Sequence, residues 1–314
     1  MKLSALLPAI IAIMTTPCIA QQNPVQRDTS YTLNSTLLKV RKAHPDMEIS
    51  AVYPEPIAGI AEEKDIPYSE VLGRFLKADL FFKQHPAAPL RPVIVMVHGG
   101  GWRTGDKSLM TPMAQQFANA DFLVMAPEYR LSTEATYPAA LHDLYTAIEW
   151  LYANAATYKL DTTRIVILGC SAGGQLAALA GTTFHKRNPH HLPLAAIIDV
   201  DGILAFKHPD SQEGTMAAQW LGGTYEEVPH RWIEASALTH ADETTPPTLF
   251  LGSKYPRFLA GRQDYIRILD AAGIKTKTQI FDDAPHSFWL FNPWFEPTVS
   301  AVLMFLKEML VSEK

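Results

Sequence analysis

The sequence predicts an α/β fold with a mostly parallel central sheet, helices on both faces and a small insertion after the sixth strand. Short apolar runs alternate along the chain with stretches whose apolar residues recur at helical spacing. The run 92–97 is apolar at every position, which is typical of a parallel strand buried on both faces. Glycines and polar residues directly follow several of these runs, at the strand ends where such sheets bind ligands.

The individual elements follow from the same patterns. A short helix is expected over 32–45, and short runs of β-favouring and aromatic residues predict antiparallel strands over 65–72 and 74–82. Further strands are expected at 92–101, 121–130, 164–169, 194–202, 247–252 and 277–283. The helices expected between and after them are 110–120, 138–158, 172–181, 261–273 and 297–310.

The N-terminal 20 residues have the features of a secretory signal peptide. Lys2 precedes an apolar stretch over 5–14, and small residues at Cys18 and Ala20 predict cleavage before Gln21. A membrane anchor is the alternative, but the apolar stretch is shorter than the ~20 residues that a spanning helix needs. Residues 21–314 are therefore expected to form one catalytic domain, periplasmic or secreted, without membrane contact after cleavage. Cys170 would then be the one remaining cysteine, so no intramolecular disulfide is expected.

Composition and charge restrict the classes of partner. The chain has 314 residues, of which 47% are hydrophobic, and this length and composition suit a single globular domain. The formal net charge is −5, so no nucleic-acid partner is expected.

The stretch "GCSAG" over 169–173 follows an apolar run and precedes a helix of small residues. A Gly-x-Ser-x-Gly turn between a strand and a helix is the context of a nucleophile elbow, which makes Ser171 the candidate nucleophile. The helix N-terminus adds positive potential where an oxyanion would form. A tight glycine turn without chemistry is the alternative interpretation, and Cys170 is expected to be a small buried apolar residue.

Two further motifs support the catalytic interpretation. "HGGG" over 98–101 lies upstream, and its glycines let the backbone approach a ligand closely. His286 follows the last expected strand and precedes the last helix. The chain order nucleophile, acid, histidine places the general base there.

The motifs "HGGGW", "PEYRLSTEATYPAALHD", "DTTRIVILGCSAGGQLAALAG" and "APHSF", in this order, resemble the α/β-hydrolase superfamily. More narrowly, they are similar to the hormone-sensitive-lipase-like and feruloyl-esterase-like (BD-FAE-type) serine esterases, over about residues 60–310. The resemblance implies a serine carboxylesterase that needs no metal or organic cofactor. It also implies that the N–H groups of Gly100, Gly101 and Ala172 form the oxyanion hole.

The acid of the triad is missing from its usual place. In the resembled family it follows the seventh strand, where this chain has Lys254 and Tyr255, neither of which can act as the acid. Asp201, after the sixth strand, is the preferred replacement because the two strand ends are neighbours. Asp264 at the start of the next helix, Asp283 three residues before the base, and a Ser–His dyad held by a backbone carbonyl are the alternatives.

The expected substrate is a short-acyl ester, such as an acetyl, methyl or feruloyl ester of plant-type polysaccharide. The insertion after Gly202 is too short for a large lid, and "PRFLAGRQD" and "PHSFWLFNPWFEP" resemble segments of polysaccharide-associated acetyl or methyl esterases. Arg257 and Arg262 are candidates for recognising a carboxylate, with a surface salt bridge as the alternative. Most aromatic residues over 288–295 are expected in the core, and one or two in the pocket. An arylformamidase or lactonase, or a non-catalytic binding protein, are the other hypotheses.

Overall fold

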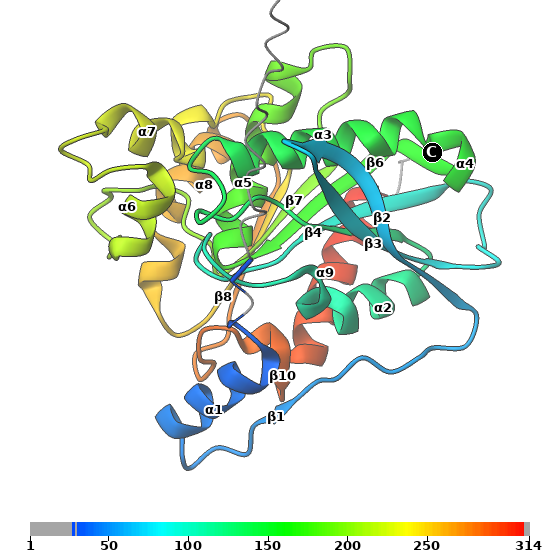
Figure 1. Cartoon of the computed structure of the whole chain (residues 1–314), viewed down its shortest axis with the longest axis horizontal. Coiled ribbons are helices and arrows are strands. Elements are labelled where there is room, and N and C mark those ends of the chain that lie inside the picture. The colour runs from blue at the N-terminus through cyan, green and yellow to red at the C-terminus, as the bar shows by residue number, and fades with distance from the viewer. Residues whose placement is uncertain (1–26, 29, 311–314) are drawn as a thin grey trace, which may run out of the picture.

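An eight-stranded sheet forms the centre of the computed structural model, which describes residues 27, 28 and 30–310 (Figure 1). Its strand order is β2-β3-β5-β4-β6-β7-β8-β9. The pairs β2–β3 and β3–β5 are antiparallel, and every neighbouring pair from β5 to β9 in this order is parallel. The strands are β2 (Ile60–Val71), β3 (Arg74–Lys83), β4 (Arg91–Val97), β5 (Leu123–Pro127), β6 (Leu160–Cys170), β7 (Ala196–Val200), β8 (Thr248–Gly252) and β9 (Thr276–Ile280). The mostly parallel sheet confirms the predicted architecture.

Helices cover both faces of this sheet (Figure 1). Alternate residues of β4 belong to opposite cores, since Val95 packs in the core of α3, α5 and α8, and Ile94 in the core of α2 and α9. The helices are α1 (Leu33–Ala43), α2 (Thr111–Asn119), α3 (Ala139–Ala153), α4 (Ala155–Tyr158), α5 (Ala172–Arg187), α6 (Thr215–Leu221), α7 (Pro229–Glu234), α8 (Arg262–Ala271) and α9 (Phe295–Leu310). The 3₁₀ segments of the described residues are η1 (Lys107–Met110), η2 (Ala237–His240), η3 (Pro256–Leu259) and η4 (Phe288–Leu290).

Element boundaries differ from the sequence prediction in a few places. β2 begins at Ile60, earlier than expected, because its ladder with β3 continues past two register shifts to the pair Ile60–Lys83. The helix expected over 138–158 divides at Asn154, whose side-chain amide donates to Trp150 O (2.8 Å). A two-stranded sheet of β1 (Ser50–Ala51) and β10 (Phe291–Asn292) was not predicted. The insertion after β7 folds into α6, α7 and η2.

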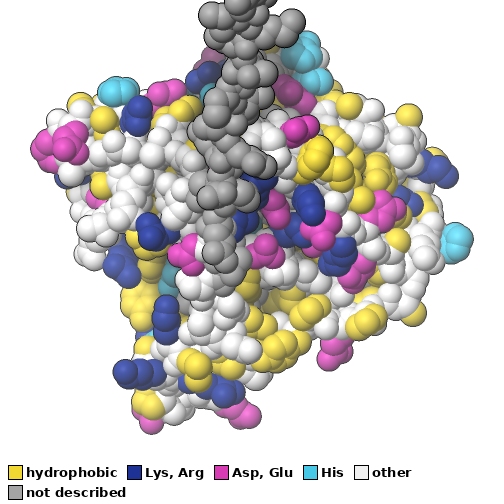
Figure 2. Space-filling view, in the orientation of Figure 1, with side chains coloured by type: hydrophobic (Ala, Val, Ile, Leu, Met, Phe, Trp, Pro, Cys, Tyr) yellow, Lys and Arg dark blue, Asp and Glu magenta, His cyan; other side chains and the backbone are white. Residues whose placement is uncertain are grey.

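Lys and Arg side chains are interspersed with Asp and Glu side chains over the face visible in Figure 2. Across the described residues, none of the helices is both long and apolar enough for a membrane crossing. The predicted signal peptide, residues 1–20, lies outside the described residues.

Candidate active site

Ser171 lies on a sharp turn between β6 and α5, with φ 57° and ψ −123°. The turn is possible only because its glycines lack side chains. A Cβ added at Gly169 would lie 1.9 Å from Gly173 O, and one added at Gly173 would lie 2.2 Å from Val97 O. Both glycines of the Gly-x-Ser-x-Gly motif therefore allow the close packing that exposes the serine at the strand end. Cys170, the neighbouring residue, is buried, and burial raises the pKa of its thiol well above the usual value.

His286 connects Ser171 with a carboxylate. Its Nε2 lies 2.8 Å from Ser171 Oγ, and its Nδ1 lies 2.7 Å from Asp201 Oδ2. The imidazole stacks on Phe258 with ring centroids 3.6 Å apart, and the ring of Trp289 meets it edge-on at 5.3 Å. These contacts orient the ring so that Nδ1 donates to the carboxylate and Nε2 accepts from the serine hydroxyl.

Asp201 follows β7 directly, in a left-handed backbone conformation with φ 55°. Its carboxylate is fully buried, and Oδ1 accepts a hydrogen bond from Ser253 N (2.9 Å). Its own N–H donates to Leu251 O (2.8 Å). The segment after β8, which lacks an acid at the usual place, thus holds the carboxylate of the neighbouring strand through a backbone N–H.

The other two candidate acids lie elsewhere. Asp264 bonds His208 (Oδ2 to Nε2, 3.0 Å) and also contacts Arg267 on its own helix. Asp283 accepts from the indole N–H of Trp294 (2.9 Å). Asp201 is therefore the carboxylate that the structure brings to the histidine.

A second buried carboxyl, Asp199, lies two residues before Asp201, and no feature of the sequence pointed to it. Burial, followed by the charge of Asp201, raises the pKa of Asp199 well above its usual range. Arg262 supplies the opposite charge from α8, and burial lowers the pKa of its guanidinium. Arg262 does not line the cavity described below, so the prediction that it reads a substrate carboxylate there is wrong.

The three residues predicted to supply the oxyanion donors line the same cavity as Ser171. Gly100 (φ 130°) and Gly101 (φ 59°) have backbone conformations that favour glycine, and Ala172 begins α5. Within the described chain, none of their N–H groups donates to another backbone or side-chain acceptor. The backbone at Gly99 packs closely against the turn that carries Ser171. A Cβ added at Gly99 would lie only 3.1 Å from Ser171 Cβ.

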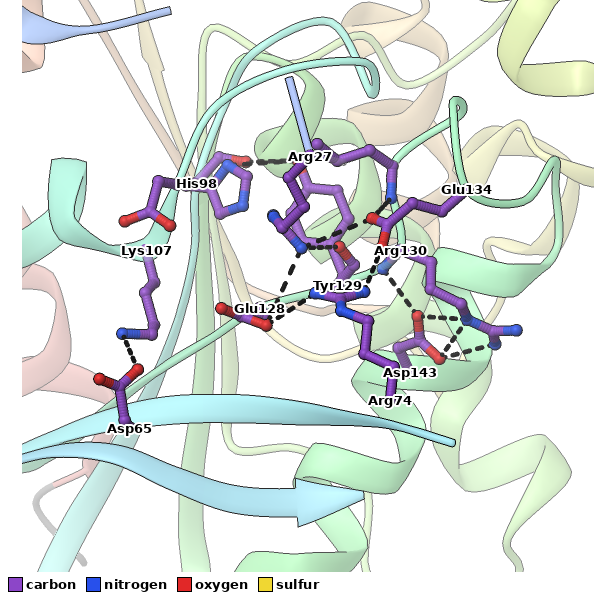
Figure 3. Close-up of polar contacts among 12 residues, drawn as sticks. Arg27, Asp65, Arg74, His98, Lys107, Glu128, Tyr129, Arg130, Glu134 and Asp143 are labelled. Atoms are coloured by element: carbon purple, nitrogen blue, oxygen red, sulfur yellow. Dashed lines mark hydrogen bonds and ion pairs between the residues drawn. The ribbon is translucent and has the colours of Figure 1, made fainter. Parts of the chain in front are cut away.

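His98, the first residue of "HGGG", anchors the start of the glycine run in the protein interior. It is buried and stacks on Tyr129 with ring centroids 4.4 Å apart, and Tyr129 Oη donates to His98 O (2.9 Å; Figure 3). Burial lowers the pKa of His98 to about 4, so the ring is neutral at pH 7. Its Nδ1–H then donates to Gly99 O (2.8 Å), which fixes the start of the glycine run.

A cavity of about 450 Å³ opens onto Ser171. Trp102 forms part of its wall, stacked on the buried Trp220 at 5.0 Å, and its indole N–H donates to Gln175 (2.9 Å). Met216 of α6 lies against Gly101. The aromatic residues after His286 are buried in the core, as expected for most of them, and the one or two expected in the pocket are absent from its lining: Phe288, Trp289, Phe291, Trp294 and Phe295.

The N-terminal segment also reaches the cavity, which sequence reasoning did not predict. Ser30, Tyr31 and Lys39 line it, together with Arg257 of η3. Over the described residues, no three His, Cys, Asp or Glu side chains gather closely enough to hold a metal ion.

Comparison with known proteins gives consistent results. A model of the BD-FAE family matches residues 78–257. Carboxylesterase NlhH of Mycobacterium tuberculosis is 40% identical over 89 residues, a match that spans 28% of each chain. Versiconal hemiacetal acetate esterase of Dothistroma septosporum is 24% identical over 293 residues, covering 85% of this chain and 87% of the relative.

A truncated carbohydrate esterase from gut microbiota has a similar solved structure. It superimposes with a TM-score of 0.68 at 20% identity, over 82% of this chain and 98% of that structure. The likeness shows that the two chains share the α/β-hydrolase fold.

Proposed function

Because the chain belongs to the BD-FAE family, we propose that it is a serine carboxylic-ester hydrolase that acts through an acyl-enzyme. The observation that carries the proposal is the chain of hydrogen bonds from Ser171 through His286 to Asp201. Two relatives similar in sequence are named as a carboxylesterase and an acetate esterase. These names favour an ester as the bond that is cleaved.

The mechanism follows from these contacts. His286 Nε2 takes the proton of Ser171 Oγ as the oxygen attacks the ester carbonyl, and the Asp201 carboxylate stabilises the imidazolium. The N–H groups of Gly100, Gly101 and Ala172 would hold the tetrahedral oxyanion. His286 then protonates the leaving alcohol, which departs as the acyl-enzyme forms. Water, deprotonated by the same imidazole, attacks the acyl carbonyl. The bond to Ser171 Oγ then breaks, the imidazolium returns its proton to Oγ, and the acid is released.

The size of the cavity favours a short acyl group. About 450 Å³ accommodates a small ester with part of its alcohol, and Trp102 and Met216 narrow the space beside Gly101. We propose acetyl, methyl or feruloyl esters of plant-type polysaccharide as the substrate class. The likeness in fold to a carbohydrate esterase and the predicted export of residues 21–314 to the periplasm or medium support this choice.

We also propose that the alcohol or acid part carries a carboxylate, as in a uronic acid. Lys39 and Arg257 line the cavity, and neither makes an ion pair within the described residues. Glu213 also lines the cavity and keeps its negative charge, because it accepts from the neutral hydroxyl of Ser211 (2.7 Å), so one carboxylate stands against the two cations. Arg257 lies over the ring of Phe258 (4.6 Å), which holds its charge at the cavity wall. Two cations in the lining without an ion-pair partner would favour an anionic substrate over its neutral analogue.

A substrate panel tests the function. The purified protein is assayed with p-nitrophenyl acetate, acetylated and feruloylated oligosaccharides, an N-formyl aromatic amine and a small lactone. Hydrolysis of the esters alone supports the proposal, whereas cleavage of the formyl amide or lactone without the esters would replace it with an arylformamidase or lactonase. No turnover of any compound would favour a non-catalytic binding protein.

A matched pair of acetyl esters, on a uronic acid and on the corresponding neutral sugar, tests the carboxylate preference. Arg257→Gln and Lys39→Gln should each lower kcat/KM for the charged ester about tenfold more than for the neutral one. Lys42→Gln, on the same helix as Lys39 but outside the cavity, is the matched control. An equal effect on both esters would remove the carboxylate from the proposed substrate.

A further inference from the structure

The N-terminal arm, residues 27, 28, 30 and 31, passes between two catalytic loops. We call residues 98–105 the oxyanion loop and residues 284–288 the base loop. The arm comes from the far end of the sequence, yet it contacts both loops through hydrogen bonds and lines the cavity at Ser30 and Tyr31.

The arm is anchored at its first described residue. Arg27 Nη1 donates to Tyr129 O (3.0 Å) and lies 3.6 Å from a carboxylate oxygen of Glu134 (Figure 3). Arg74 joins the same group through Glu128 (2.8 Å) and Glu134. The Arg27 side chain is only 13% exposed, so this end of the arm is held inside a network of ion pairs beneath the oxyanion loop.

The middle of the arm is bonded to the oxyanion loop itself. Thr104 Oγ1 donates to Asp28 O (2.7 Å) and accepts from Tyr31 N (3.1 Å). Gly105 N also donates to Asp28 O (3.3 Å). One threonine hydroxyl thus joins two points of the arm, directly after the glycines that are proposed to bind the oxyanion.

The last residue of the arm reaches the base loop. Tyr31 Oη and Ser287 Oγ are 2.9 Å apart, and Ser287 follows His286 in a left-handed conformation with φ 73°. Burial raises the pKa of Tyr31, so its hydroxyl stays protonated and keeps its hydrogen bond over the neutral range. No other side chain of the described residues bonds the Ser287 hydroxyl.

We propose that Tyr31 is a positioning residue, and that the arm fixes the spacing between the oxyanion donors and His286. The inference rests on the proposed ester hydrolysis. Its physical basis is that both loops must be held at one separation, because a misplacement of about 1 Å can cost as much as 100-fold in rate. The arm supplies the link between them through Thr104 on one side and Ser287 on the other.

Tyr31→Phe tests this proposal, because it keeps the ring and removes only the hydroxyl. The expected result is a fall in kcat of about tenfold with KM changed by less than about twofold, since the serine and base lose alignment rather than substrate contacts. Tyr53→Phe is the matched control, as Tyr53 donates to Asn34 (2.9 Å) on the surface outside the cavity. An unchanged kcat in Tyr31→Phe would overturn the positioning role.

Hydrogen exchange provides a readout that does not depend on activity. Tyr31→Phe should speed exchange in the base loop, and Thr104→Val should speed it in the oxyanion loop, while Tyr53→Phe leaves both at the wild-type rate. If the wild-type protein hydrolyses none of the esters, the proposed function fails and exchange alone decides whether the arm holds the loops. Exchange unchanged in both variants would refute the link.

Discussion

Asp201 is the residue that distinguishes this site from the pattern that its sequence resembles. Its carboxylate bonds His286 and is itself held by the backbone N–H of Ser253. The N–H fixes one carboxylate oxygen and leaves the other for the imidazole. An acid directly after β7 can therefore replace one after β8, because the ends of neighbouring parallel strands lie side by side.

Asp201→Asn should lower kcat by about 10⁴ with little change in KM, because an amide favours the wrong tautomer of His286. Steady-state kinetics on p-nitrophenyl acetate measure the effect. Asp264→Asn and Asp283→Asn are the matched controls, as these carboxylates bond other partners. A large loss in either control, with Asp201→Asn active, would show that the acid is assigned to the wrong residue.

At the scale of elements, α6 connects the insertion with the cavity. Met216 lies against Gly101, where its thioether occupies space beside the oxyanion donors. α6 is held by Trp220, which is buried and stacks on Trp102. The insertion thus shapes the pocket although it is too short to act as a large lid.

Met216→Ala should widen the pocket and raise the ratio of kcat/KM for p-nitrophenyl butyrate over acetate by about tenfold, within the range that one or two methylenes supply. Measurement of both esters on the wild type and the variant gives the ratio. Met304→Ala, an exposed methionine on α9 remote from the cavity lining, is the control. A ratio equal to that of the wild type would mean that α6 does not bound the acyl group.

The elements themselves were largely predictable from local patterns. Fully apolar runs and helical periodicity located the parallel strands and the main helices, and the strand ends located Ser171, His286 and Asp201. The choice among three aspartates depended on which strand ends are neighbours. The preferred one, Asp201, is the carboxylate that hydrogen-bonds His286.

Contacts between distant parts of the chain were not predictable. The sequence predicted only the short helix over 32–45 in this part of the chain, because no local pattern indicates a hydrogen bond such as Tyr31 to Ser287. The buried carboxyl of Asp199 was missed for the same reason, since an aspartate within an apolar run gives no sign of its neighbours. Arg262 was misjudged because the direction of its side chain depends on how α8 packs.

At the scale of the whole molecule, buried ionisable groups make stability depend on pH. His98 has a pKa of about 4 in the folded protein, below the ordinary value of 6.5. Between these two values the unfolded chain binds a proton that the folded chain does not, so the free energy of unfolding falls as pH falls from 6.5 to 4. Asp199 acts in the opposite direction, because its raised pKa favours the folded state at low pH.

His98→Asn isolates the histidine, since the amide N–H can still donate to Gly99 O in place of Nδ1. The free energy of unfolding of the wild type, relative to this variant, should fall by about 3 kcal/mol between pH 6.5 and 4. Urea denaturation at several pH values measures the difference. Parallel curves for the two proteins would show that His98 does not titrate as described.

Covalent trapping of Ser171 tests the central claim most directly. The protein is incubated with a fluorophosphonate, its intact mass is measured, and the modified peptide is sequenced. We expect one adduct per chain, located on Ser171, absent from Ser171→Ala and formed far more slowly in His286→Ala. An unmodified protein, or an adduct on another residue, would contradict a serine hydrolase mechanism at this site.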